Sequence, residues 1–191
     1  MRVIAGEYRS RPLRSLPGMD IRPTTDRLRE TLFDVLCAGN PAALQGTVWL
    51  DLFAGTGAVG IEALSRGAKM VYFADTSAKA AEVIRQNLKS LKAEVGFEVM
   101  HVDALRALRR LSTQGVAADF VFLDPPYRMQ AAYRETLEFL AGSGSLAPSA
   151  LVIAEHEKRS DPGDVFGALR RYRKLEQGDA ALSFYRQAGN D

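Results

Sequence analysis

The stretch TVWLDLFAGTGAVG, residues 47–60, decides the fold. Its first half, TVWLDLF (47–53), is typical of a buried strand, and a glycine-rich turn follows it directly. Glycines at such a turn tolerate positive φ and let a ligand approach the backbone closely. A helix is expected from about residue 57 to residue 66. The stretch therefore predicts a strand, a tight turn and a helix, with the turn as a candidate ligand site.

The same alternation continues along the chain. A capped helix from Thr24 or Thr25 to about Ala38 precedes the first strand, and repeated strand–helix units predict a parallel sheet with right-handed crossovers. Two strand-like segments near the end flank Gly178 and Asp179, which predicts an antiparallel hairpin. We expect an α/β, Rossmann-like fold with a mostly parallel seven-stranded sheet. The other strands are expected at 69–75, 97–103, 119–124, 150–155, 170–177 and 180–187, and the other helices at 77–91, 104–111 and 130–141.

The composition is that of one globular domain. The chain has 191 residues, of which 47% are hydrophobic and 25% charged, so it can bury one full core. No segment reaches the roughly 18 apolar residues that a membrane span needs, and the start has no apolar signal core. One cysteine excludes an internal disulfide, and the two histidines form no Cys/His cluster for a metal. We therefore expect a cytoplasmic protein with neither a membrane nor a metal partner.

The beginning of the chain carries an excess of arginine. Residues 1–31 hold seven arginines against four acids and contain no lysine. Arginine suits planar, bidentate recognition of phosphate, so Arg9 and Arg11 are candidates for binding a polyanion. A solvated, charged extension explains the same composition equally well. Turn-forming prolines predict a small hairpin or ribbon, so we expect a single domain made of an arm over 1–23 and a Rossmann-like core over 24–191.

The glycines of the turn fit the pattern G-x-G-x-x-G, which is a weak signal alone. No Gly-Lys-Ser/Thr follows, so the turn is not a phosphate-cradling P-loop. A nicotinamide-dinucleotide site stays open, although a pyrophosphate would meet the carboxylate of Asp51 there. A cationic ligand fits that carboxylate better, and S-adenosylmethionine carries both an ammonium and a sulfonium. A helix-capping or surface acid is the alternative role for Asp51.

Three successive strands are expected to end in acids on one rim of the sheet. After Asp51, Asp75 could accept both ribose hydroxyls of an adenosine, and Asp103 could accept a hydrogen bond from an adenine amine. Each of these two acids could also cap the helix that follows it. The candidate cofactor contacts are Asp51, Phe53, Gly55, Gly57, Asp75, Asp103 and Ala104.

A second stiff turn, Asp124-Pro125-Pro126-Tyr127, ends the strand at 119–124. Prolines cannot donate backbone hydrogen bonds or sit in a central strand, so they fix the backbone. An amine conjugated with a ring is a weak nucleophile, because its lone pair is delocalised. The carboxylate of Asp124 and the carbonyl of Pro125 could accept its hydrogens and favour attack, while Tyr127 stacks on the base, a contact worth roughly 1–3 kcal/mol. A proline-rich loop with a buried tyrosine is the alternative.

Together the two motifs resemble the class I S-adenosylmethionine-dependent methyltransferases. The segments RVIAGEYRSRPL and RPTTDRLRETLFDVL resemble the bacterial RsmD family, which methylates the 2-amino group of a guanine in 16S ribosomal RNA. The similarity extends to about Gln187. Ser10 stands where that family usually has glycine between two arginines, and Ser77 stands where many members have a second acid. The resemblance implies that the side facing the RNA or the active site includes Arg22, Thr24, Arg27 and Arg29.

We therefore expect an enzyme that transfers methyl from S-adenosylmethionine to a guanine 2-amino group in 16S rRNA. By resemblance, its partner is this RNA within a small-subunit particle, and we expect a monomer. Asp124 and Pro125 would orient the amine, and Tyr127 would hold the ring. A DNA or RNA adenine-N6 methyltransferase uses the same chemistry, and a catalytically silent RNA- or cofactor-binding module is a second alternative.

Overall fold

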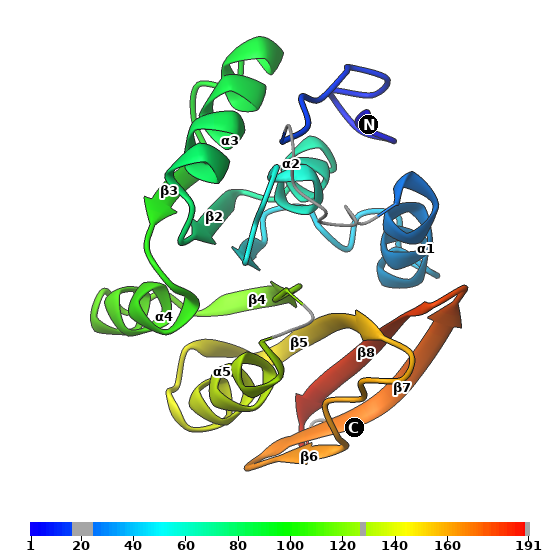
Figure 1. Ribbon diagram of the computed structural model, residues 1–191, viewed down its shortest axis with the longest axis vertical. Helices are drawn as coiled ribbons and strands as arrows, with labels where there is room; N and C mark the ends of the chain where they lie inside the picture. The colour runs from blue at the N-terminus through cyan, green and yellow to red at the C-terminus, as the bar shows by residue number, and fades with distance from the viewer. Residues whose placement is uncertain (17–24, 127–128, 190–191) are drawn as a thin grey trace. The chain divides into compact units, whose positions relative to one another are not determined.

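The computed structural model describes residues 1–16, 25–126 and 129–189. The chain forms two compact units, Met1–Val102 and Asp103–Asp191, and each combines helices with strands. Figure 1 colours the first unit from blue to green and the second from green to red. The organisation as a single domain stays a prediction. In the described part of the chain, no helix is both long and apolar enough to cross a membrane.

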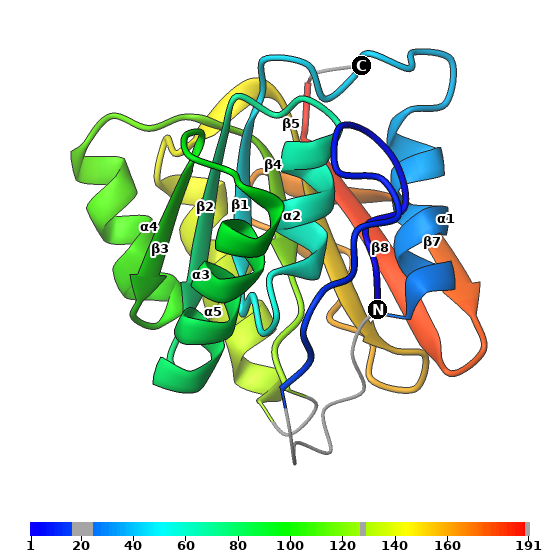
Figure 2. The ribbon, with the colours of Figure 1, turned by 90° about the horizontal axis from the view of Figure 1, so that it is seen from above.

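The first unit holds three parallel strands in the order β3-β2-β1. Its elements are α1 (Asp26–Leu36), β1 (Val48–Leu52), α2 (Ala58–Ser65), β2 (Met70–Asp75), α3 (Ala78–Leu91) and β3 (Phe97–His101). Figures 1 and 2 show α2 and α3 on the same side of these strands. The register pairs Asp51 with Phe73, and Asp75 with His101. Because the strands are parallel, the turns that follow β1 and β2 lie at one edge, where ligands bind in such folds.

The N-terminal residues lie against α2 and α3, as the blue trace in Figure 1 shows. The carboxylate of Glu62 accepts hydrogen bonds from the backbone N–H groups of Ile4 at 2.7 Å and Ala5 at 2.9 Å. The side-chain oxygen of Asn87 accepts the N–H of Arg14 at 2.8 Å. One antiparallel bridge, between Arg2 and Pro12, closes a small hairpin. The described part of the expected arm is thus tied to the first unit by buried acceptors. Two apolar side chains of the arm, Val3 and Leu13, are also buried.

The second unit orders its strands β4-β5-β8-β7-β6. Its elements are α4 (Ala104–Thr113), β4 (Ala118–Leu123), α5 (Gln130–Gly142), β5 (Leu146–Glu157), β6 (Val165–Phe166), β7 (Leu169–Gln177) and β8 (Ala180–Gln187). β4 and β5 are parallel, whereas β8 pairs antiparallel with both β5 and β7. The hydroxyl of Tyr133 on α5 donates to the carbonyl of Glu155 at 2.6 Å, which fixes the helix against β5.

The expected α/β fold, with parallel strands followed by an antiparallel C-terminal hairpin, is confirmed. Two details differ from the sequence prediction. The strand expected at 150–155 begins at Leu146, because Leu146 pairs with Ala118. The register is irregular beyond this pair, and Pro148 and Ser149 interrupt the strand pattern in the sequence. The described residues also hold an eighth strand, β6, whose two residues are too few to show a periodicity.

Candidate active site

The turn between β1 and α2 is built from left-handed backbone. Phe53, Gly55 and Gly57 have φ values of 65°, 56° and 75°. A Cβ on Gly57 would come within 3.0 Å of the Ile84 side chain, so packing as well as φ favours glycine there. Phenylalanine rarely adopts positive φ, and such strain is found preferentially at functional sites. The turn that the sequence marked as a candidate ligand site is therefore strained and specifically shaped.

Asp75 ties this turn to the next strand. Its Oδ2 accepts the N–H of Gly55 at 2.8 Å, and its Oδ1 accepts the N–H of Ser77 at 2.8 Å. A carboxylate oxygen has two lone pairs, so each oxygen can accept a further hydrogen bond. The cap of α3 is Ser77, whose hydroxyl accepts the N–H of Ala80 at 3.2 Å, so Asp75 is not the helix cap. The half-buried carboxylate is thus available for the two ribose hydroxyls, a role that stays a prediction.

Asp51 lies beneath the turn with only 2% of its surface exposed. Its Oδ2 accepts the N–H of Gly60 at 2.8 Å, and a Cβ on Gly60 would stand 2.9 Å from the same oxygen. Burial raises the pKa of Asp51 to about 8, against the smaller opposing effect of the Gly60 hydrogen bond. Asp51 therefore does not present an open carboxylate at the surface, which corrects the premise of the sequence prediction, and its raised pKa favours the protonated acid. Direct contact with a cationic ligand stays a prediction.

Asp103 forms the helix cap that the sequence left open. Its Oδ1 accepts the N–H of Arg106 at 2.8 Å, and its Oδ2 lies 3.3 Å from Nε of Arg106. The side chain keeps 44% of its surface exposed, so capping does not exclude a ligand contact. The neighbouring Ala104 is buried at the first position of α4. Both remain predicted cofactor contacts.

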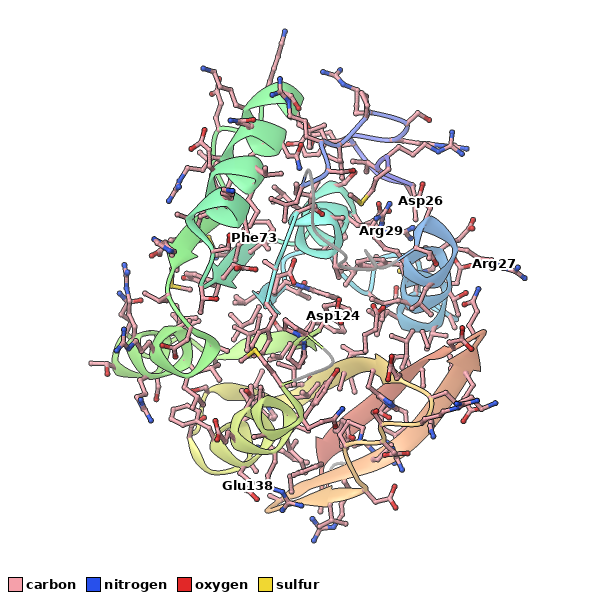
Figure 3. All side chains as sticks on the ribbon, in the orientation of Figure 1. Asp26, Arg27, Arg29, Phe73, Asp124 and Glu138 are labelled. Carbon is pink, nitrogen blue, oxygen red and sulfur yellow. The ribbon has the colours of Figure 1, made fainter. Side chains whose placement is uncertain are left out.

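The proline turn follows β4 directly, and Figure 3 labels Asp124 where that strand ends. Asp124 is half-buried, Pro125 is buried and Pro126 is exposed. The carbonyl of Pro126 accepts the N–H of Met129 at 2.7 Å, which turns the chain into α5. Tyr127 lies outside the described residues. The arrangement leaves a carboxylate and proline carbonyls, but no proline N–H, at the tip of a buried strand.

The arginines predicted to face RNA divide into two groups. Arg9, Arg11 and Arg27 are exposed, although Arg11 also donates to the carbonyl of Ser90 at 3.2 Å. Figure 3 shows Arg27 extending away from α1. Arg22 and Thr24 lie outside the described residues.

The structure corrects the prediction that Arg29 faces RNA or the active site. Its side chain has no exposed surface, donates to the backbone carbonyl of Arg2 and pairs with Asp26 at 3.1 Å and Glu62 at 3.9 Å. Burial lowers its pKa, whereas the two carboxylates favour its charge. Figure 3 shows it on the other side of α1 from Arg27. The residue follows buried Leu28 on the apolar side of the helix, so it fixes the N-terminal hairpin rather than contacting RNA.

A hollow of about 570 Å³ lies between the N-terminal hairpin and α1, within the first unit. Arg2, Arg9 and Arg27 line it together with Asp26 and Glu30. Arg2 lines this hollow but was not predicted from the sequence to be a site residue. Its only signal was the excess of arginines, since the hollow depends on how the hairpin folds back along the helices.

Known proteins resemble this chain over nearly its whole length. A family model described as Conserved hypothetical protein 95 matches residues 1–186. The putative rRNA methyltransferase YlbH of Bacillus subtilis is 34% identical over 189 residues, covering 99% of this chain and 100% of the relative. The ribosomal RNA small subunit methyltransferase D of Haemophilus influenzae is 38% identical over 159 residues, covering 83% and 79%. The solved structure of the putative methyltransferase yhhF from Escherichia coli has a TM-score of 0.80 at 34% identity, covering 98% of this chain and 97% of that one.

Proposed function

The chain belongs to the family described as Conserved hypothetical protein 95, and we propose that it methylates the 2-amino group of a guanine in 16S ribosomal RNA with S-adenosylmethionine as donor. The observation that carries the proposal is the end of β4, where Asp124 precedes two prolines that offer carbonyls but no N–H group. We call Asp124, Pro125 and Pro126 the acceptor tip. The names of two relatives, a putative rRNA methyltransferase and a ribosomal RNA small subunit methyltransferase, support the class of substrate. We further propose a monomeric, cytoplasmic enzyme that acts within a small-subunit particle.

The first unit would hold the cofactor. Apart from Gly55 and its two neighbours in the chain, nothing in the described chain stands within 4 Å of the place that a Cβ on Gly55 would occupy, so the strained turn has open space beside its backbone. Asp75 has lone pairs left for the two ribose hydroxyls, since each oxygen has one backbone N–H. These residues fit S-adenosylmethionine, which supplies an electrophilic methyl group when it is bound. Phe53 and Gly57 of the same unit would add further contacts, and Asp103 and Ala104, which begin the second unit, stay predicted contacts.

The second unit would hold the acceptor amine. Asp124 and the carbonyl of Pro125 would accept the two amine hydrogens and direct the nitrogen lone pair away from the ring. Because the prolines fix the backbone, these acceptors need no rearrangement when the amine arrives. Asp124 would also take the proton that the nitrogen loses, and Tyr127 would stack on the base. A base within a duplex would first have to be flipped out.

Transfer of tritiated methyl groups tests the proposal. The protein is incubated with 16S rRNA, with assembled small subunits and with DNA, and the product is digested to nucleosides. We expect the label in N2-methylguanosine from ribosomal RNA. Label in N6-methyladenosine or in DNA would instead identify an adenine methyltransferase, and cofactor binding without any labelled product would identify a silent module.

A further inference from the structure

β7 carries cations on both faces, and among the described residues only the cations of one face, Arg171 and Lys174, form ion pairs. Arg171 pairs with Asp161 at 2.6 Å and also contacts Asp164, and Lys174 pairs with Asp161 at 2.9 Å and with Glu176 at 3.2 Å. These cations stand opposite Tyr185 and Ser183 of β8 in the register. Such a network explains half of the basic run RRYRK (170–174) without any ligand.

The other face is different. Arg170 stands opposite Arg186, and Arg173 stands opposite Phe184. Within the described ranges, neither Arg170 nor Arg173 makes an ion pair, and both are exposed. Since opposing residues of an antiparallel pair share a face, these arginines gather positive charge on one side of the hairpin. We call Arg170, Tyr172, Arg173 and Arg186 the β7 surface.

An aromatic ring stands among these arginines. The register of β7 shifts between Arg171 and Arg173, and Tyr172 at this irregularity keeps 43% of its surface exposed. The guanidinium of Arg186 lies 5.0 Å from the centre of the Tyr172 ring, and the charges of Arg173 and Arg186 both act to lower its pKa against the larger raising effect of burial. Exposed aromatic rings flanked by arginines are the platforms on which proteins stack unpaired bases.

The β7 surface is also close to the acceptor tip within the same unit. Four residues on adjacent strands are paired in one row across the sheet, which spans three strand spacings: Phe122 of β4, Ile153 of β5, Phe184 of β8 and Arg173 of β7. At a spacing of about 4.8 Å, that separation is roughly 14 Å. Asp124 follows Phe122 by two residues, so a strand of RNA held at the acceptor tip could reach the β7 surface.

We propose that the β7 surface binds an unpaired RNA segment flanking the target guanine, with Tyr172 stacking on a base and Arg170, Arg173 and Arg186 contacting phosphates. The inference rests on the proposed function for the identity of the RNA. Charge complementarity favours RNA as the occupant, because the face combines several arginines with an exposed ring. A ribosomal protein is the competing occupant.

Binding of a 16S rRNA transcript, measured by filter retention at several salt concentrations, tests this proposal. We expect Tyr172→Ala to raise Kd about tenfold and Tyr172→Phe to leave it unchanged, since phenylalanine keeps the stacking face. Arg173→Gln should raise Kd and reduce the slope of log K against log salt by about 0.7, the value for one phosphate contact on a single strand. The matched control is Arg109→Gln, which removes an exposed arginine of α4 that has no ion pair among the described residues.

The outcomes separate this proposal from the proposed function. If Tyr172→Ala and Arg173→Gln bind the transcript like Arg109→Gln, the β7 surface does not contact RNA, even where the wild type methylates guanine. A defect seen only with assembled particles would overturn the proposal in favour of a protein partner. Loss of transcript binding by a protein that labels no guanine would support the β7 surface while refuting the proposed function. Thermal unfolding checks that both variants fold. If Tyr172→Ala is unfolded, Arg173→Gln decides the result, because Arg173 is exposed.

Discussion

The turn after β1 and the turn after β4 both end a buried strand, but they become rigid by opposite means. In the first, three backbone N–H groups are taken by acceptors: that of Ala54 by the carbonyl of Ala74 at 3.0 Å, that of Gly55 by Asp75 at 2.8 Å and that of Gly57 by the carbonyl of Ala54 at 2.7 Å. In the second, Pro125 and Pro126 have no N–H to satisfy.

The two turns therefore depend on different parts of the chain for their shape. The first turn needs a side chain from another strand, Asp75, to hold its shape. The second is stiffened by its own sequence and presents acceptors, of which Asp124 is the charged one. Damage to the first should therefore reduce stability and cofactor binding together, whereas damage to the second should reduce turnover alone.

The largest effect is expected at the second turn. Asp124→Ala should lower kcat about 10²- to 10⁴-fold, because the amine loses its acceptor and its proton carrier. Affinity for S-adenosylmethionine should stay within about twofold of the wild type, as calorimetry would show beside the tritium assay. Asp124→Asn retains one acceptor oxygen and should fall between the two. Equal losses of turnover and cofactor binding in Asp124→Ala would mean that the acid is structural.

Asp75→Ala tests the dependence of the first turn on a distant strand. The N–H groups of Gly55 and Ser77 would lose their acceptor, so the free energy of unfolding should fall by about 2–3 kcal/mol. The Kd for S-adenosylmethionine should rise at least about tenfold, because one or two hydrogen bonds to the ribose would be lost. Urea denaturation and calorimetry measure both quantities. The control Ser77→Ala removes only the cap of α3 and should cost about 1 kcal/mol without changing the Kd.

The buried acid of the first turn predicts a dependence on pH. Burial raises the pKa of Asp51 to about 8, so between pH 5 and 7 the folded protein holds a proton that the unfolded chain has released. This group therefore makes stability fall as pH rises, by up to about 1.4 kcal/mol per pH unit. Asp51→Asn should remove that contribution, which appears as the difference between the two proteins in urea denaturation across this range. Parallel curves would show that Asp51 is already ionised in the folded state.

The smallest effect separates strain from ligand contact. Gly55 and Gly115 both have positive φ, 56° and 71°, and a Cβ on either would meet no described atom within 4 Å. Alanine at either position should therefore cost about 1 kcal/mol of stability for the left-handed backbone. Only Gly55→Ala should weaken S-adenosylmethionine binding, because its side chain would enter the space beside the turn. An equal cofactor affinity in both variants would place the ligand elsewhere.

Much of the fold was readable from local patterns. The apolar runs of β1 and β4 and the turn residues that follow them, glycines in one case and prolines in the other, are properties of adjacent residues. The bounds of β5 and the existence of β6 were not readable, because they depend on which residues pair across the sheet. The roles of Asp51 and Asp103 were left open for the same reason. The structure shows that Asp51 is buried and that Asp103 caps α4, while their contacts with a cofactor stay predictions.

The sequence by itself determined the order of strands and helices and the two rigid turns, because periodicity, glycine and proline act over a few residues. Only the tertiary structure decided which charges are available. Arg29 is buried because Glu62, far along the chain, lies beside it, and Arg171 is neutralised because Asp161 reaches it from another segment. Charge is compensated by residues far along the chain as well as by near neighbours such as Asp26, so a list of arginines cannot tell those that hold the protein together from those left to bind a partner.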